Sequence, residues 1–140
     1  MNRRQLLAVA VLCAAVPAWA AGLTITNAWS RSTPPGVTVG VAYFTLKNDT
    51  GKPDRLLRIS SPVASKVQVH RTEILDGIAR MREVAVLHVE AGQTLEFAPN
   101  GMHVMLTGLK QPLVEGKTFE IELLFEVAGP RAVKVAIRKH

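Results

Sequence analysis

Short runs in which apolar and polar residues alternate recur along this chain, and they constrain its fold more than any other feature. The clearest run, residues 118–127, has apolar side chains at Phe119, Ile121, Leu123, Phe125 and Val127. Two further runs have the same period, with apolar side chains at Val37, Val39, Val41 and Tyr43 and at Val133, Val135 and Ile137. Because successive side chains of a β-strand point to opposite faces, this period predicts strands with one face in a core.

Turn-forming residues separate these runs and set the spacing of the predicted strands. They are Pro34-Pro35-Gly36, Asn48-Asp49-Thr50-Gly51, Asp76-Gly77, Ala91-Gly92, Pro99-Asn100-Gly101 and Gly129-Pro130. Several short strands at this spacing are typical of an antiparallel β-sandwich or a small Greek-key barrel. There is no capped helical pattern, internal repeat or low-complexity linker, so the sequence predicts one all-β domain over residues 21–140.

The first 20 residues have the pattern of a secretory signal peptide. Arg3 and Arg4 precede an apolar run over residues 6–16, and Ala18-Trp19-Ala20 supplies a cleavage site of the A-x-A type. The apolar run is too short to cross a membrane as a helix. We therefore expect the mature chain, residues 21–140, to be exported to the periplasm without any segment inserted in a membrane.

Composition narrows the chemistry of the mature chain. The only cysteine, Cys13, lies in the predicted leader, so residues 21–140 have no disulfide, thiol nucleophile or thiolate ligand. Removing 20 of the 140 residues leaves 120, and removing two arginines leaves 15 basic against 11 acidic side chains, a charge of +4. These charges are scattered, which argues against nucleic-acid binding. No catalytic motif occurs, so we do not expect an enzyme.

Two histidines and two methionines lie where strand geometry directs them to shared faces. His103-Val104-Met105 places His103 and Met105 on one face of a strand. Val104 and Leu106 lie on the other face, which is the natural core face. The Asp76-Gly77 pair predicts a two-residue hairpin turn, whose register places His70 and Met81 on one face as diagonal neighbours, about 7–8 Å apart. A three-residue turn would instead place them on opposite faces.

Two imidazoles and two thioethers form a soft set of donors, which favours Cu(I) over Zn²⁺ or Mg²⁺ and lacks the thiolate of a blue-copper site. The spacing alone leaves an alternative open, in which the histidines are ordinary surface or hydrogen-bonded residues and the methionines pack in the core. The other candidates have structural interpretations. His88 has no partner at strand spacing, and Met102 faces opposite to His103 and is expected to pack. His140 is expected to lie in a solvated tail, with a loose extra copper ligand as its alternative role.

In chain order the four candidate ligands form the pattern His70-x10-Met81-x21-His103-x-Met105, which resembles the signature of the periplasmic copper chaperone family PCu(A)C. The surrounding motifs are also similar to that family. They are Asn27-Ala28-Trp29-Ser30-Arg31, Pro34-Pro35-Gly36, Tyr43 with Asn48, Met81-Arg82, and the segment NGMHVMLTGL at residues 100–109. The likeness covers essentially all of residues 21–140, with Thr107 as a departure where relatives often have Met.

The resemblance implies a cupredoxin-like β-sandwich that binds one Cu(I) ion through His70, Met81, His103 and Met105. It also implies delivery of this copper to a respiratory haem-copper oxidase, commonly to its Cu(A) centre. The expected partner is the copper acceptor of that oxidase or one of its assembly factors. We expect a monomer, because an exposed transfer site must stay accessible.

Three other functions remain compatible with the sequence. The same site would also serve a protein that buffers excess periplasmic copper without a dedicated acceptor. A copper electron carrier is a second alternative, against which the absence of cysteine argues. The third is a metal-free β-sandwich that binds a protein partner.

Overall fold

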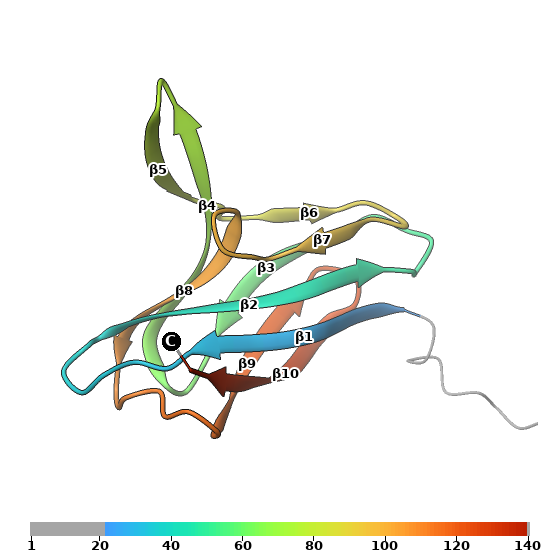
Figure 1. The fold of residues 1–140 in the computed structure, drawn as a ribbon. Coiled ribbons are helices and arrows are strands. Elements are labelled where there is room, and N and C mark those ends of the chain that lie inside the picture. Colours follow the sequence, from blue (N-terminus) through green and yellow to red (C-terminus); the bar gives the residue numbers. More distant parts are fainter. Residues whose placement is uncertain (1–21, 140) are drawn as a thin grey trace, which may run out of the picture.

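The computed structural model describes residues 22–139, and this part of the chain consists of ten strands joined by turns (Figure 1). The strands are β1 (Leu23–Arg31), β2 (Val39–Asn48), β3 (Asp54–Ser60), β4 (Ala64–Leu75), β5 (Ile78–Glu83), β6 (Leu87–Val89), β7 (Thr94–Glu96), β8 (Met102–Leu109), β9 (Thr118–Phe125) and β10 (Gly129–Arg138). The all-β prediction is confirmed. None of the described residues forms a helix able to cross a membrane. The predicted leader with Cys13, and His140, lie outside the described residues.

These strands belong to one sheet that curls on itself, so that its two halves face each other around a core (Figure 1). Their order is β5-β4-β8-β2-β1-β10-β9-β3-β6, and β7 pairs with β2 beyond the end of β8. The pairs are antiparallel as predicted, with one exception among the described strands. β1 and β10 run parallel, with Trp29 opposite Ala136, which joins the first and last strands in the middle of the sheet.

The core contains the alternating side chains of β9 and β10. On β9 the residues that face inward are at most 8% exposed, and these are Phe119, Ile121, Leu123 and Phe125. Burying a side chain of this size contributes about 1.5–3 kcal/mol to folding. The alternating run was predicted to extend to Val127, but β9 ends at Phe125. Val127 lies in the following turn and is largely exposed.

At the start of β2 the face that enters the core is not the face of its valines, whereas farther along the predicted run Tyr43 is buried at 6% exposure. Val37 and Val39 are exposed, whereas Ala42 and Phe44 are buried between the two halves of the sheet. The period of two was correct, but the apolar run marks the outer face at the start of this strand. Packing is tight on the inner face, where a Cβ at Gly40 would lie 3.1 Å from Cδ1 of Leu113. A side chain at that inward position would require Leu113 to shift by a few tenths of an ångström.

The β4–β5 hairpin has the predicted turn. Asp76 and Gly77 both adopt positive φ angles, 53° and 76°, as a two-residue type I′ turn requires, and Leu75 lies opposite Ile78. The hairpin projects from the body of the molecule (Figure 1), and β5 forms one edge of the sheet with all of its residues exposed. The fold therefore holds the first half of β4 against β8 and leaves the second half to pair with β5 alone.

Candidate metal site

The two candidate histidines lie side by side on neighbouring strands. β4 pairs with β8 in a register that places His70 directly opposite His103. The centroids of the two imidazole rings are 5.8 Å apart, and the rings are tilted by 51°. The sequence predicted the face of each residue on its own strand. It did not predict that these two strands are neighbours.

Each imidazole has one nitrogen held by a neighbouring oxygen. Nδ1 of His103 donates to the carbonyl oxygen of Gly101 at 3.2 Å, and Nε2 of His70 donates to Oε1 of Gln68 at 3.3 Å. Because these oxygens accept, the neutral form of each ring has its proton on the nitrogen that faces them. The other nitrogen of each ring then has a free lone pair.

Those lone-pair nitrogens are buried and have no partner. They are Nδ1 of His70 and Nε2 of His103, and they are the buried side-chain nitrogen or oxygen atoms of the described residues that lack a hydrogen bond. An unpaired buried polar atom costs about 1–3 kcal/mol, so such atoms in a native fold point to a function or to a missing ligand. Two adjacent imidazole nitrogens of this kind fit a metal ion that prefers nitrogen and sulfur donors.

The pKa of His70 is lowered from its ordinary value. Burial is the largest cause, because it disfavours the charged ring, and the neighbouring His103 also lowers the pKa. The carboxylate of Glu83 opposes this shift and Lys66 adds to it. The ring of His70 is therefore neutral at pH 7, which is the form that binds a metal ion.

The methionines occupy different positions on this face. Met105 lies two residues beyond His103 on β8, where it is half-buried and paired with Val41 on one side and Gln68 on the other. Met81 lies on β5 opposite Thr72, one diagonal step from His70 as predicted, and its side chain is 63% exposed. The structure thus gathers three candidate ligands on β4 and β8 and places the fourth on the projecting hairpin.

The degree of burial of His103 differs from the prediction. Its side chain faces away from Val104, as expected, but it is only 4% exposed instead of lying open on an outer surface. The reason is the position of β8, which has β4 on one side and β2 on the other. Side chains from both neighbours flank an outward residue on a central strand.

Comparison with known proteins identifies the family. Residues 23–137 match the model of the family described as "Putative lipoprotein LpqE-like". The chain belongs to the LpqE-like family. A relative from Leifsonia xyli subsp. xyli, named "Putative lipoprotein Lxx21020", is 32% identical over 84% of this chain and 70% of its own length.

Two solved structures extend the comparison and confirm the PCu(A)C resemblance. The copper-bound PCuAC domain from PmoF2 has a TM-score of 0.71 over 84% of this chain and 93% of that domain, and at 24% identity it shows the shared fold. The Cu(I)-bound form of DR1885 from Deinococcus radiodurans is 32% identical, with a TM-score of 0.66 over 88% of this chain and 84% of that protein.

An aromatic pair lies on the same face of this LpqE-like chain, beyond the histidines. Tyr43 follows Ala42, which pairs with Val104 of β8, and the Tyr43 ring lies 4.6 Å from the ring of Trp29 on β1. The guanidinium of Arg138 lies 5.2 Å from the centre of the Trp29 ring. Trp29 is partly buried and packs against the core.

The remaining candidates do not join the histidine pair. His88 is exposed on β6 opposite Arg55, and Met102 packs against the core with its sulfur 3.6 Å from Nη2 of Arg71. Within residues 22–139 no three His, Cys, Asp or Glu side chains gather as a metal site. Sequence reasoning missed the contact of Gln68 with His70, although both residues lie two apart on one face of a strand.

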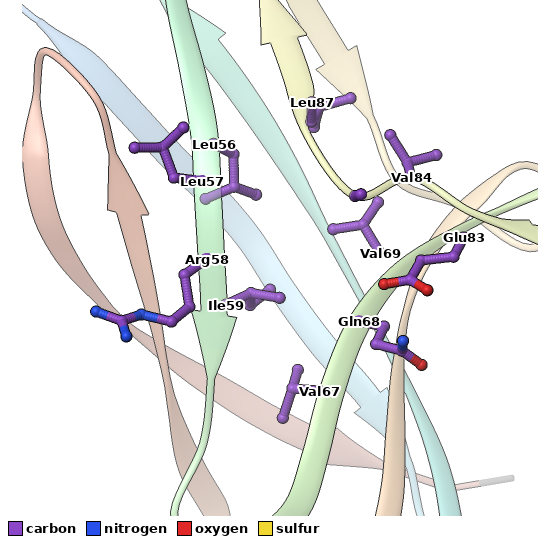
Figure 2. A pocket seen from close by; sticks show the side chains of 11 residues that line it. Leu56, Leu57, Arg58, Ile59, Val67, Gln68, Val69, Glu83, Val84 and Leu87 are labelled. Carbon is purple, nitrogen blue, oxygen red and sulfur yellow. The ribbon is translucent and has the colours of Figure 1, made fainter.

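A groove of about 160 Å³ lies near the site, between β3 and the first half of β4. Figure 2 shows its apolar lining, to which Ile59 and Val69 belong, with Gln68 and Glu83 on the β4 side. Arg58 points away from it in this view. The groove marks where the curled sheet fails to close, and Gln68 is the residue that connects its rim to the ring of His70.

Proposed function

We propose that this protein is a copper carrier of the periplasm that binds one Cu(I) ion and delivers it to the Cu(A) centre of a respiratory haem-copper oxidase, without enzymatic turnover. The observation that carries this proposal is the pair of buried lone-pair nitrogens on His70 and His103. The similarity to the Cu(I)-bound form of DR1885 supports it.

The donor set fits Cu(I). In the proposed site His70 and His103 supply two neutral nitrogens, and Met105 and Met81 supply two thioether sulfurs. Soft sulfur donors select Cu(I) over the harder divalent ions. The hydrogen bonds to Gln68 and Gly101 orient the rings before the ion arrives, as outer-shell partners do at metal sites.

Delivery follows from the different exposure of the ligands. Met81 is the most exposed of the four, so an incoming thiolate or imidazole of the acceptor displaces its sulfur first. Met105 then leaves, and His103 is released last because its ring is buried and fixed by Gly101. The ion therefore passes to the acceptor by stepwise exchange of ligands.

Export is part of the same proposal. The leader pattern in residues 1–20 directs a chain across the inner membrane, and the relative from Leifsonia xyli is named as a lipoprotein, a class of exported protein. Edman sequencing of the protein purified from periplasm tests this step, and the expected first residue is Ala21.

An anaerobic titration with Cu(I) against a coloured chelator tests the binding site. The wild-type protein should take up one equivalent, and the His103→Ala/Met105→Ala variant should lose it. His88→Ala is the matched control, because that histidine is exposed on β6, and it should bind as wild type does. Wild-type protein that cannot compete for Cu(I) would contradict the proposal.

A deletion strain tests delivery. Loss of oxidase activity under copper limitation, restored by added copper, is expected of a carrier that supplies the oxidase. Sensitivity to excess copper with normal oxidase activity would instead assign the site to copper buffering.

A further inference from the structure

The two faces of the β4–β5 hairpin carry different chemistry. Beyond Glu83, the face that carries His70 continues toward the turn without a charged group, and we call this part the hairpin site face, made of Thr72, Ile74, Ala79 and Met81. The opposite face is charged before it reaches the turn, and it carries Arg71, Glu73, Arg80 and Arg82, followed by Leu75 and Ile78.

The hairpin site face is highly exposed for an apolar surface. The side chain of Ile74 is 72% exposed and that of Met81 63%, and the whole hairpin stands away from the core (Figure 1). Folding does not use these side chains, since they bury little area in the monomer. An apolar surface next to a binding site is typical of a surface that another protein covers.

A second copy of this chain is a poor occupant. The free edge of β5 offers backbone groups for pairing, but a symmetric pair of β5 strands centred on Arg80 or Met81 would bring Arg80 against Arg80 or Arg82 of the other copy. Like charges placed opposite each other destabilise such pairing, and charged side chains protect sheet edges in this way. Repulsion between arginines therefore disfavours pairing of two β5 edges, while the hairpin site face stays apolar and exposed.

We propose that the hairpin site face is the docking surface for the protein that receives copper, and this inference rests on the proposed function. The partner has an apolar surface around its copper-accepting site, because the hairpin site face carries no charged residue between Glu83 and the turn. The arginines of the hairpin, Arg71, Arg80 and Arg82, lie on the opposite face and do not enter this surface.

Geometry places the acceptor on this face. Ligand exchange requires an acceptor atom within bonding distance of the ion, and Met81, the first sulfur to leave, belongs to the hairpin site face. An acceptor that approaches Met81 also covers Ile74, which lies one diagonal step from it on the same face of the β4–β5 pair. The burial of this apolar area stabilises the encounter and excludes water while the ligands exchange.

The rate of Cu(I) transfer from the copper-loaded mature chain tests this proposal with two matched variants. Ile74→Gln alters the hairpin site face, and Ile78→Gln makes the same change on the opposite face, where Ile78 is 56% exposed. Neither residue is a proposed ligand, and glutamine adds no charge. The probes are the apo form of the soluble Cu(A) domain of the oxidase and, as an acceptor that needs no docking, bathocuproine disulfonate.

Ile74→Gln should slow transfer to the Cu(A) domain about tenfold, the scale expected for losing one buried aliphatic side chain. Its transfer to the chelator, and the transfer of Ile78→Gln to both acceptors, should match wild type. Equal rates for all three proteins with the Cu(A) domain would overturn the docking surface and leave delivery intact. Equal slowing by both variants would also overturn it, because the effect would not be specific to one face.

Two further outcomes separate this inference from the proposed function. Wild-type protein that binds Cu(I) but does not load the Cu(A) domain would overturn both the delivery step and the proposed partner, while the binding site would stand. A concentration-dependent dimer in sedimentation, abolished by Ile74→Gln, would assign the hairpin site face to a second copy and overturn the proposal.

Discussion

Two hairpins of this molecule, β9–β10 and β4–β5, have the same antiparallel pairing but place their apolar side chains in opposite environments. In β9–β10 alternate side chains such as Ile121 and Val135 are fully buried in the core. In the outer half of β4–β5 apolar side chains such as Ile74 and Ile78 are mostly exposed, and β5 lies at the sheet edge. One hairpin stabilises the fold, and the other presents a surface.

The boundary between these two uses runs through β4. Up to His70 this strand has β8 as its neighbour, and its inner face buries Val69 at 3% exposure. Beyond Arg71 it pairs with β5 alone. The candidate metal site lies at that boundary, where the pairing of β4 with β8 positions His70 and His103 and the projecting hairpin carries Met81.

Two isoleucine substitutions should give the largest contrast. Ile121→Ala in β9 removes a fully buried side chain and should lower the free energy of unfolding by about 2–5 kcal/mol. Ile74→Ala in β4 should change it by less than about 0.5 kcal/mol, because that side chain is 72% exposed. Urea denaturation of both variants measures the difference. Similar losses would mean that the hairpin does contribute to the stability of the core.

The sequence predicted the parts of this fold that local rules determine. The alternation in residues 118–125 and the Asp76-Gly77 turn depend on neighbours a few residues apart, and both are confirmed. The parallel pairing of β1 with β10 and the outward valines of β2 depend on distant partners. A Cβ at Gly40 would lie 3.1 Å from Cδ1 of Leu113, which is distant along the chain, and no periodicity within β2 contains that information.

The two candidate methionines differ in the same way as the two hairpins, because Met105 is half-buried within the sheet and Met81 is exposed on the β4–β5 hairpin. Met105→Leu removes a sulfur held between β4 and β2 and should lower Cu(I) affinity about 100-fold or more, because Met105 is a proposed direct ligand and the loss of even an outer-shell partner costs about 10–100-fold. Met81→Leu should have a smaller effect, because ordering a free methionine side chain costs up to about 2 kcal/mol and offsets part of its bond. Competition titrations of both variants test the order. A larger loss for Met81→Leu would contradict it.

Gln68 is not a proposed ligand, but it contacts the ring of His70 and should help to orient it. Gln68→Leu removes the oxygen that holds Nε2 of His70 and should lower Cu(I) affinity about tenfold without unfolding the protein. Gln68→Glu keeps an acceptor at the same place, so it should restore most of the affinity at pH 8. If both variants bind like wild type, the contact with Gln68 does not orient the ring.

In the candidate site, as in the fold, the features that depend on one strand were predictable, and the contacts between distant strands were not. Spacing on single strands identified the faces of His103 with Met105 and of His70 with Met81. The adjacency of His70 to His103 is a contact between β4 and β8, and the burial of His103 follows from its central strand. Sequence patterns within one strand do not contain either fact.

The smallest expected effect concerns pH in the protein without copper. The lowered pKa of His70 means that the unfolded chain takes up a proton before the folded chain does as pH falls through 6.5. The free energy of unfolding should therefore begin to fall below pH 6.5 and stop falling once the folded pKa is passed. His70→Gln should remove this component, whereas His88→Gln, on exposed β6, should keep it. Urea denaturation between pH 5.5 and 8 measures the difference between wild type and each variant. If the pH dependence of His70→Gln matched that of wild type, burial of the ring beside His103 would not be the source of the loss, and the ring would titrate as it does in the unfolded chain.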